Sequence, residues 1–272
     1  MNMASETKKV AVVMPFYKET LSVYEKIAIT QCQNILSAYA IIAIKPQHLT
    51  LPAELPHDMF KQTVSFDDEY FKGIAGYNAL MLADTFYRAF LDYDYILIYQ
   101  LDAFVFEDTL QYWCGQNYDY IGAPWLREFE YADIFKATKS KVKAWFHTRY
   151  NVQKNGLPSL MQYENKVGNG GLSLRRVKKF YDLSLEMRDM AETYLSRKVD
   201  LYNEDMFWSI EVNRKKKRLH IPAYKTALKF SIENFPERAL KLNKGRLPFG
   251  CHAWDLHIDF WRPVFEQYGY DI

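Results

Sequence analysis

Short, uninterrupted apolar runs alternate with helical patterns along the first part of the chain. Residues 10–14, 40–44 and 95–99 contain no polar alternation, which is typical of parallel strands that are buried on both faces. A fourth strand is expected at residues 61–66, and residues 20–38 and 76–91 have helical periodicity. This order predicts an α/β fold with a mostly parallel central sheet flanked by helices. Ligands of such sheets bind at the carboxyl ends of the strands.

The second part of the chain is less regular. Residues 126–165 are rich in aromatic residues and lysines, and we interpret them as an irregular insertion over the site, partly helical around residues 132–146. Further helices are expected at residues 176–187 and 203–213. Because no linker or repeat divides the chain, we expect a single domain over residues 1–272.

Charge and cysteine content exclude several classes of protein. The net charge of +2 gives no global field that would attract nucleic acid, so we expect no nucleic-acid partner. The basic run at residues 214–218 is interpreted as a solvated helix end, with contact to an anionic membrane surface as the alternative. Three cysteines match neither a metal motif nor a disulfide framework, which favours a reducing, cytoplasmic location.

Several phosphate-binding and hydrolase motifs are absent from the sequence. Neither G-x-G-x-x-G after the first strand nor G-x-x-x-x-G-K-[ST] occurs, which argues against a dinucleotide-dependent dehydrogenase and a P-loop enzyme. The hydrolase elbow G-x-S-x-G is absent too.

Two motifs follow expected strands. Asp102 comes just after the strand at residues 95–99, where a carboxylate can meet a ligand's phosphates or a cation, or cap a turn. The run Gly168-Asn169-Gly170-Gly171 permits positive φ and close backbone approach to a ligand, and a plain tight turn is the alternative.

Two further motifs carry titratable groups. Asn203-Glu204-Asp205 opens a helix, where an acid can serve as a general base or only complement the helix dipole. His252 lies beside a small residue and Trp254, and can be a metal or phosphate ligand or a structural histidine.

The order of these motifs resembles that of GT-A fold glycosyltransferases over nearly the whole chain. The runs Leu-Asp-Ala-Phe-Val-Phe at residues 101–106, Val-Gly-Asn-Gly-Gly at 167–171 and Asn-Glu-Asp at 203–205 are similar to those of a bacterial family known mainly as a domain of unknown function. The resemblance implies a GT-A-like, Rossmann-like fold, with residues 10–122 as the donor-nucleotide half and residues 123–272 as the acceptor half.

The resemblance also implies roles for single residues. Asp205 would be the catalytic base, and Glu204 would bind acceptor hydroxyls or orient that base. The residues that would bind the donor are Pro15, Tyr17, Lys72, Asn78, Asp102 and Ala103. Those that would bind the acceptor are Trp125, Asn169, Gly170, Gly171 and Trp254, although each tryptophan, like the aromatics after the first strand, can equally be a core residue.

The metal site is where the sequence departs from the superfamily. Its Asp-x-Asp motif holds Mn²⁺ or Mg²⁺, but here Phe104 replaces the second acid. Asp102 and His252 could supply a reduced metal site. Otherwise cationic side chains would stabilise the leaving group, and Lys72, Arg175 and Arg246 are the candidates.

The resemblance thus implies a glycosyltransferase that moves a sugar from a nucleotide-sugar donor to an oligosaccharide or glycolipid acceptor, with inversion. It would act in bacterial surface glycan synthesis, in the cytoplasm or peripheral to the inner membrane, in an oligomeric state that the sequence leaves open. A non-catalytic carbohydrate- or nucleotide-binding relative is the alternative. A nucleotidyltransferase is disfavoured because residues 15–19 lack that class's glycine- and arginine-rich loop.

Overall fold

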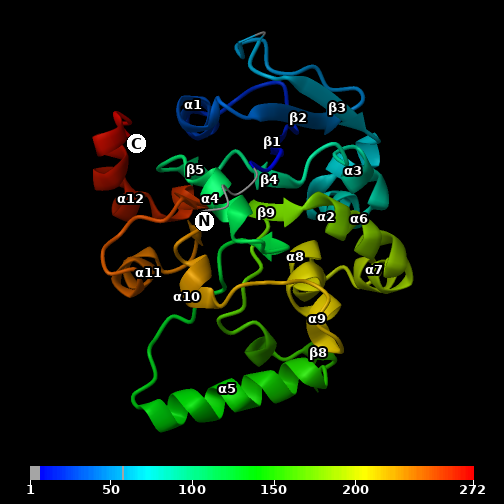
Figure 1. Cartoon of the computed structure of the whole chain (residues 1–272), viewed down its shortest axis with the longest axis vertical. Coiled ribbons are helices and arrows are strands. Elements are labelled where there is room, and N and C mark those ends of the chain that lie inside the picture. The colour runs from blue at the N-terminus through cyan, green and yellow to red at the C-terminus, as the bar shows by residue number, and fades with distance from the viewer. Residues whose placement is uncertain (1–6, 57) are drawn as a thin grey trace, which may run out of the picture.

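A six-stranded sheet forms the centre of the computed structural model, which describes residues 7–56 and 58–272 (Figure 1). Its strand order is β3-β2-β1-β4-β9-β6, and only β9 runs antiparallel to its neighbours. The predicted mostly parallel α/β architecture is therefore confirmed. The strands are β1 (Val10–Pro15), β2 (Ala40–Pro46), β3 (Gln62–Phe66), β4 (Tyr95–Tyr99), β6 (Tyr120–Ile121) and β9 (Leu172–Arg176).

Both faces of the sheet are covered, which explains the uninterrupted apolar runs. Along β1, Val10, Val12 and Met14 pack into one core and Ala11 and Val13 into another. The first core is closed by α1 (Val23–Leu36), and the second by α2 (Gly73–Leu82), α3 (Asp84–Arg88) and α6 (Val177–Glu186). A strand buried on both sides has no polar face to alternate.

Local signals fix some helix ends and miss others. The α1 helix begins after Ser22, which forms a capping box with Glu25. The single helix predicted at residues 76–91 is wrong. The chain turns extended at Ala83, with ψ of 136°, and this separates α2 from α3. The ion pair between Asp84 and Arg188, 3.0 Å, ties the start of α3 to α7 (Arg188–Leu195).

A second, small sheet of order β10-β11-β5 lies beside the first. It consists of β5 (Phe104–Val105), β10 (Ser231–Ile232) and β11 (Gly250–Cys251), and with α12 (Ile258–Phe265) it encloses a third core. Phe104 is fully buried there and stacks on Phe265, with ring centroids 4.0 Å apart. The side chain that replaces the second acid of the motif is thus a core residue.

The remaining elements lie around these sheets. Residues 204–214 form one continuous helix with a π-helical middle, comprising α8 (Glu204–Met206), a π segment (Phe207–Glu211) and α9 (Val212–Arg214). None of the helices formed by the described residues is long and apolar enough to cross a bilayer. The other helices and strands are α4 (Leu110–Gly115), α5 (Ile134–Arg149), β7 (Gln153–Lys154), β8 (Leu157–Pro158), α10 (Tyr224–Ala227) and α11 (Pro236–Leu242).

Candidate active site

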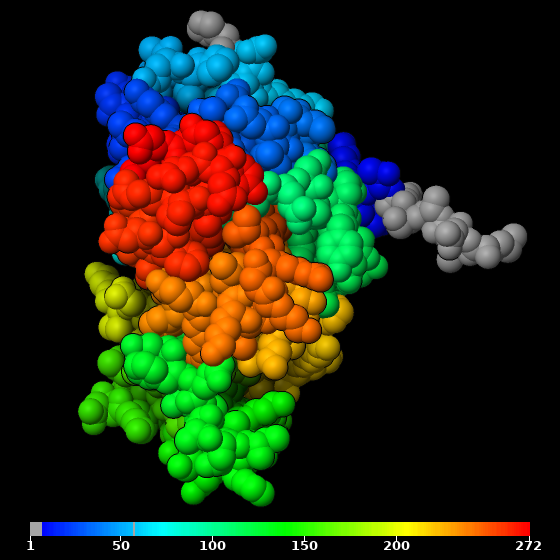
Figure 2. All heavy atoms as spheres, turned by 90° about the vertical axis from the view of Figure 1, so that its left-hand side faces the viewer, coloured from blue at the N-terminus to red at the C-terminus, as the bar shows by residue number. Residues whose placement is uncertain are grey.

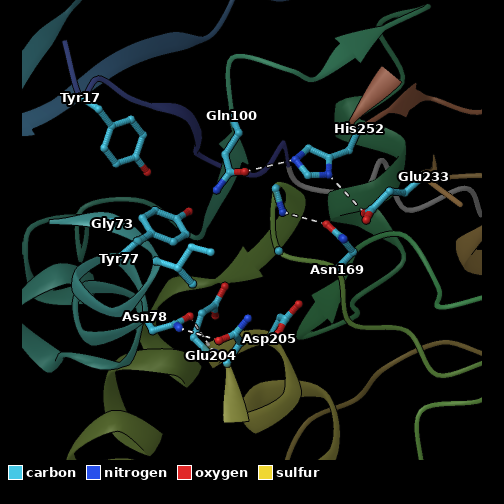
Figure 3. Close-up of a pocket in the computed structure, with 14 residues that line it drawn as sticks. Tyr17, Gly73, Tyr77, Asn78, Gln100, Asn169, Glu204, Asp205, Glu233 and His252 are labelled. Carbon is cyan, nitrogen blue, oxygen red and sulfur yellow. Dashed lines mark hydrogen bonds and ion pairs between the residues drawn. The ribbon is translucent and has the colours of Figure 1, made fainter. Parts of the chain in front are cut away.

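A cavity of about 610 Å³ opens at the carboxyl ends of β1 and β4. It is bordered by the start of α2, the glycine run before β9, the start of α8 and the ends of β10 and β11. Its size is ordinary for a small-molecule site, and its position is the one that a parallel sheet favours for ligands. Figure 3 shows the side chains that surround it.

Sheet topology brings these distant segments together. β9 begins where its antiparallel neighbour β4 ends, and the backbone N–H of Gln100 donates to the carbonyl of Gly171 at 2.9 Å. β10 and β11 are parallel, so Glu233 and His252, which follow them, end side by side. Gln100 and His252, which are 152 positions apart in the sequence, thereby face one cavity.

Glu204 is held in a buried ion pair with Arg175. The guanidinium donates two hydrogen bonds, from Nη1 to Oε2 at 3.2 Å and from Nη2 to Oε1 at 3.0 Å. Arg175 is fully buried and also donates to the Tyr87 hydroxyl at 2.9 Å. The hypothesis that Arg175 is a free cation for the leaving group is therefore wrong, because its charge is already neutralised.

Asn78 joins α2 to the start of α8. Its Nδ2 donates to Oδ1 of Asn203 at 2.8 Å, and its Oδ1 accepts from the backbone N–H of Glu204 at 3.1 Å. Asn203 precedes the helix but makes no side-chain capping bond, since its oxygen is used by Asn78. Although Asn78 lines the cavity, its amide is occupied in positioning α8.

Asp205 lines the cavity next to this fixed framework. Its Oδ1 accepts from the backbone N–H of Met206 at 2.7 Å. Burial first, and then the negative charge of Glu204, hold the pKa of Asp205 well above its usual range. A carboxylate with a raised pKa is a stronger base than an exposed one, so Asp205 is chemically suited to accept a proton from a bound hydroxyl.

His252 lies between two carboxylates. Its Nε2 is 3.1 Å from Asp102 Oδ1. The same nitrogen is 3.1 Å from Gln100 Oε1, and Nδ1 is 3.2 Å from Glu233 Oε2 (Figure 3). Burial alone would lower the pKa of His252, but the charges and hydrogen bonds of Asp102 and Glu233 outweigh burial and raise it to about 10. The imidazole is therefore cationic at neutral pH in this arrangement.

A divalent cation fits this corner of the site if a ligand completes its coordination. Within the described part of the chain no group of three or more His, Cys, Asp and Glu residues forms a metal cage. However, Asp102 Oδ1 and His252 Nε2 are 3.1 Å apart. Adjacent ligands at about 2.1 Å around an octahedral ion are separated by about 3 Å. Ions that accompany nucleotides commonly use one or two protein side chains plus phosphate oxygens.

Asp102 borders a neighbouring cavity of about 340 Å³, which shares Tyr17 and Gln100 with the first. The side chains of Tyr17 and Tyr77, whose ring centroids are 6.3 Å apart, form an aromatic wall (Figure 3). The wall lies across the first cavity from His252 and Glu233. The two joined cavities are thus aromatic on one side and charged on the other.

The reason for the glycines at residues 168–171 differs from the one predicted. None of Gly168, Gly170 and Gly171 has a positive φ among the described residues. A Cβ on Gly170 would lie 2.5 Å from Glu204 Oε1, and one on Gly171 would lie 1.8 Å from His252 Nε2. These glycines therefore allow two functional side chains to pack on the backbone, and the close approach is to the protein's own groups.

Several predicted donor contacts lie away from the cavity. Lys72 is exposed and pairs with Glu69, and it does not line the cavity. Arg246 borders a different pocket with Lys229 and Lys244. Pro15 and Ala103 are buried in the sheet and the adjoining core, so only their backbones could approach a ligand.

The two tryptophans that were expected to bind the acceptor, Trp125 and Trp254, do not line the cavity. Trp254 is fully buried and packs against Tyr24 and Phe265. Trp125 packs beside Gly168 and Tyr163 and is not among the residues that line the cavity. The helix expected around residues 132–146 is observed as α5, but no residue of 126–165 lines the cavity, so this segment does not cover it as predicted.

Glu233, Gln100 and Tyr77 line the cavity but were not singled out from the sequence. Glu233 follows a two-residue strand with no recognisable pattern, so the sequence gives no signal for it. Gln100 directly follows a strand that was recognised, and its place at the carboxyl end was the signal that could have identified it.

Comparisons with known proteins identify the fold. The chain is similar to the galactosyltransferase LgtC solved with donor and acceptor sugar analogues, with a TM-score of 0.53, 11% identity, and 89% of this chain and 86% of that chain covered. An active-site mutant of LgtC gives a TM-score of 0.50 at 13% identity, with the same coverage of 89% and 86%. At such identities the likeness shows the fold alone. No curated protein matches the sequence.

The sequence itself matches a family over residues 61–252, which include Asp102, the glycine run, Asp205 and His252. The chain belongs to the family described as protein of unknown function (DUF5672).

Proposed function

We propose that this protein is a glycosyltransferase that transfers a sugar from a nucleotide-sugar donor to a carbohydrate acceptor in the cavity described above. The observation that carries the proposal is the placement of Asp205, a carboxylate with a raised pKa, in the same cavity as His252, which pairs with Asp102 of the neighbouring cavity. One group can accept a proton while the other binds a diphosphate. The GT-A-like fold supports this division of roles.

In the proposed donor site, the nucleobase lies against the aromatic wall of Tyr17 and Tyr77. The diphosphate lies at His252, whose charge or bound cation neutralises the departing phosphate oxygens. Alternatively, with His252 deprotonated at Nε2, Asp102 and His252 would hold Mn²⁺ or Mg²⁺, which would supply Lewis-acid stabilisation of the leaving group. Glu233 orients the imidazole from its other nitrogen.

In the proposed reaction, Asp205 accepts the proton of an acceptor hydroxyl as its oxygen bonds to the anomeric carbon of the donor sugar. The bond from that carbon to the β-phosphate oxygen breaks, and the nucleoside diphosphate leaves with the electron pair. A single displacement of this kind inverts the anomeric centre. Glu204 acts indirectly, by fixing the start of α8 through Arg175 and by raising the pKa of Asp205.

The acceptor class is proposed from the resemblance, as an oligosaccharide or glycolipid of a bacterial surface glycan. The backbone of residues 169–171, beside Asp205 in the cavity, is where we place it.

A screen of nucleotide sugars and acceptor oligosaccharides with product detection tests the proposal. The wild type should transfer one sugar, and Asp205→Asn should lower the rate by about 10²–10⁴-fold with little change in nucleotide binding. Asp200→Asn, an exposed acid just before the motif, is the matched control and should remain active. Equal transfer by wild type and Asp205→Asn would remove the assigned base.

A non-catalytic binding relative is the second candidate, favoured by Phe104 in place of an acid. Nucleotide binding without transfer to any acceptor, in wild type and Asp205→Asn alike, would support that candidate instead.

A further inference from the structure

Helix α5 (Ile134–Arg149) differs from an ordinary surface helix in the side that faces the protein. Its protein-facing side carries small or polar side chains: Ala144 and His147 are buried, and Ala137 and Ser140 are half-buried. The large apolar side chains are exposed instead. A surface helix normally turns its apolar stripe toward the core.

The outward side chains form an apolar strip, which Thr138 interrupts between Phe135 and Val142. We call Ile134, Phe135, Val142, Trp145 and Phe146 the outer face of α5; they are 75%, 83%, 61%, 60% and 50% exposed. At about 3.6 residues per turn they occupy about one third of the helix circumference. Tyr150, which is 63% exposed, extends the strip through its contact with Phe146, with ring centroids 4.6 Å apart.

Lysines border the strip on both sides. The charged residues within α5 are Lys136, Lys139, Lys141, Lys143 and Arg149, and none is acidic. Lys139, Lys141 and Lys143 make no ion pair with any described residue. By helical geometry Lys139 and Lys143 lie along one edge of the outer face and Lys141 along the other.

The positive charge continues onto the neighbouring segment. Arg149 Nη1 donates to the carbonyls of Arg214 and Lys215 at 3.0 and 2.9 Å, which brings the exposed lysines 215–217 next to the end of α5. A cavity of about 460 Å³ between α5 and α9 is lined by Lys141, Arg149 and Lys166 together with Trp145.

The position of α5 leaves this surface accessible. Figure 1 shows the helix at one end of the long axis of the molecule, away from the central sheet, and in Figure 2 the green segment that contains it forms the lower end. The inner side of the helix is secured by a 2.8 Å contact between His147 Nδ1 and Ser159 Oγ and by the Arg149 bonds above. The outer face is therefore presented on a fixed helix.

We propose that the outer face of α5 docks the protein on an anionic lipid bilayer. Exposed aromatic rings with flanking lysines are the composition of helices that lie in the plane of the membrane interface. Tryptophan is favoured at that level of the bilayer, and lysine stems can extend so that their charges reach the headgroups. The excess of cations selects an anionic surface. The proposal goes beyond the proposed function and does not rest on it.

Sedimentation with vesicles tests the proposal. The full chain should sediment with vesicles of phosphatidylcholine and phosphatidylglycerol, much less with phosphatidylcholine alone, and less again as salt is raised. Trp145→Ser with Phe146→Ser should lower the partition coefficient at least about tenfold, because each lost aromatic removes buried apolar area. Lys139→Glu with Lys143→Glu should abolish the preference for phosphatidylglycerol.

Matched controls distinguish binding through the outer face of α5 from effects of net charge and of misfolding. Lys225→Glu with Lys241→Glu reverses the same number of exposed charges elsewhere, and Leu256→Ser removes an apolar side chain that is 76% exposed; both should bind like the wild type. If the double aromatic variant melts at a lower temperature, Phe135→Ser, 83% exposed in another turn, should still reduce binding.

Three results would overturn the proposal. The first is that the wild type does not sediment with anionic vesicles. The second is that the Lys225/Lys241 control loses as much binding as the Lys139/Lys143 variant. The third is that sedimentation velocity shows a dimer that the Trp145/Phe146 variant loses while vesicle binding is unchanged, which would assign the outer face to a second copy of the chain.

Discussion

Arg175 and Glu204 form a buried, doubly hydrogen-bonded ion pair directly behind Asp205. Both acids of the Glu204-Asp205 motif line the cavity, but the ion pair occupies the two carboxylate oxygens of Glu204 and not those of Asp205. Only one of the two neighbouring acids is thus paired with a buried cation.

Glu204→Gln should therefore destabilise the protein by about 3–5 kcal/mol, because it leaves the Arg175 charge buried without its counterion. Urea unfolding measures the effect. Arg175→Met combined with Glu204→Gln should recover part of the loss, since no unpaired charge remains. An unfolding midpoint for Glu204→Gln equal to that of the wild type would contradict the structural role given to the pair.

Asp205→Asn should stabilise the protein at neutral pH while it removes transfer. Burial and then Glu204 raise the pKa of Asp205 above the ordinary 3.8, so the folded chain binds this proton more tightly than the unfolded chain. The free energy of unfolding of the wild type consequently falls as pH rises from the ordinary pKa to the raised one.

The asparagine of the Asp205→Asn variant would not titrate. At pH values above the raised pKa, the variant should therefore exceed the wild type in free energy of unfolding by about 1.4 kcal/mol for each unit of pKa shift. This difference in stability should become smaller toward acidic pH. Thermal melts of both proteins across pH measure this difference. A variant less stable than the wild type at neutral pH would show that the carboxylate of Asp205 is stabilised in the fold, and the proposed base would lose its physical rationale.

The central sheet could be predicted because its signal is local. The uninterrupted apolar runs of β1, β2 and β4 reflect burial on both faces of the sheet. This burial can be recognised from the residues of each strand alone. The break at Ala83 could not be predicted, since no proline or glycine interrupts the helical pattern there.

The candidate site was predictable where its residues stand in recognisable motifs. Asp102, Asp205 and His252 were chosen because the order of their motifs resembles that of GT-A glycosyltransferases, and the structure gathers all three around two cavities that share lining residues. Trp254 was misplaced because an indole fits a core and a sugar site equally well. Glu233 was missed because its partner His252 is 19 residues away, across a pairing of two short strands.

Gly171→Ala should displace the imidazole of His252. The added Cβ would lie 1.8 Å from Nε2, so the imidazole must leave its position between Asp102 and Gln100. Nucleoside diphosphate binding, measured by calorimetry, should weaken by about tenfold or more, as expected for loss of a charge-assisted contact. Gly115→Ala, where a Cβ meets nothing within 4 Å, is the matched control and should bind normally.

Chelation should weaken nucleotide binding if the Asp102–His252 corner receives a cation. The two ligand atoms are 3.1 Å apart and need phosphate oxygens to complete a coordination shell, so metal and nucleoside diphosphate should bind together and each should strengthen the other. In thermal melts with Mn²⁺, the diphosphate should stabilise the fold by about 2.7 kcal/mol at 100 times its dissociation constant. EDTA should reduce the stabilisation of the wild type by the diphosphate. In Asp102→Asn the stabilisation by the diphosphate should be the same with and without EDTA. Asp92→Asn changes an exposed acid elsewhere and should behave as the wild type. A diphosphate-induced shift in the wild type that is the same with Mn²⁺ and with EDTA would leave the positive charge of His252 as the group that balances the diphosphate.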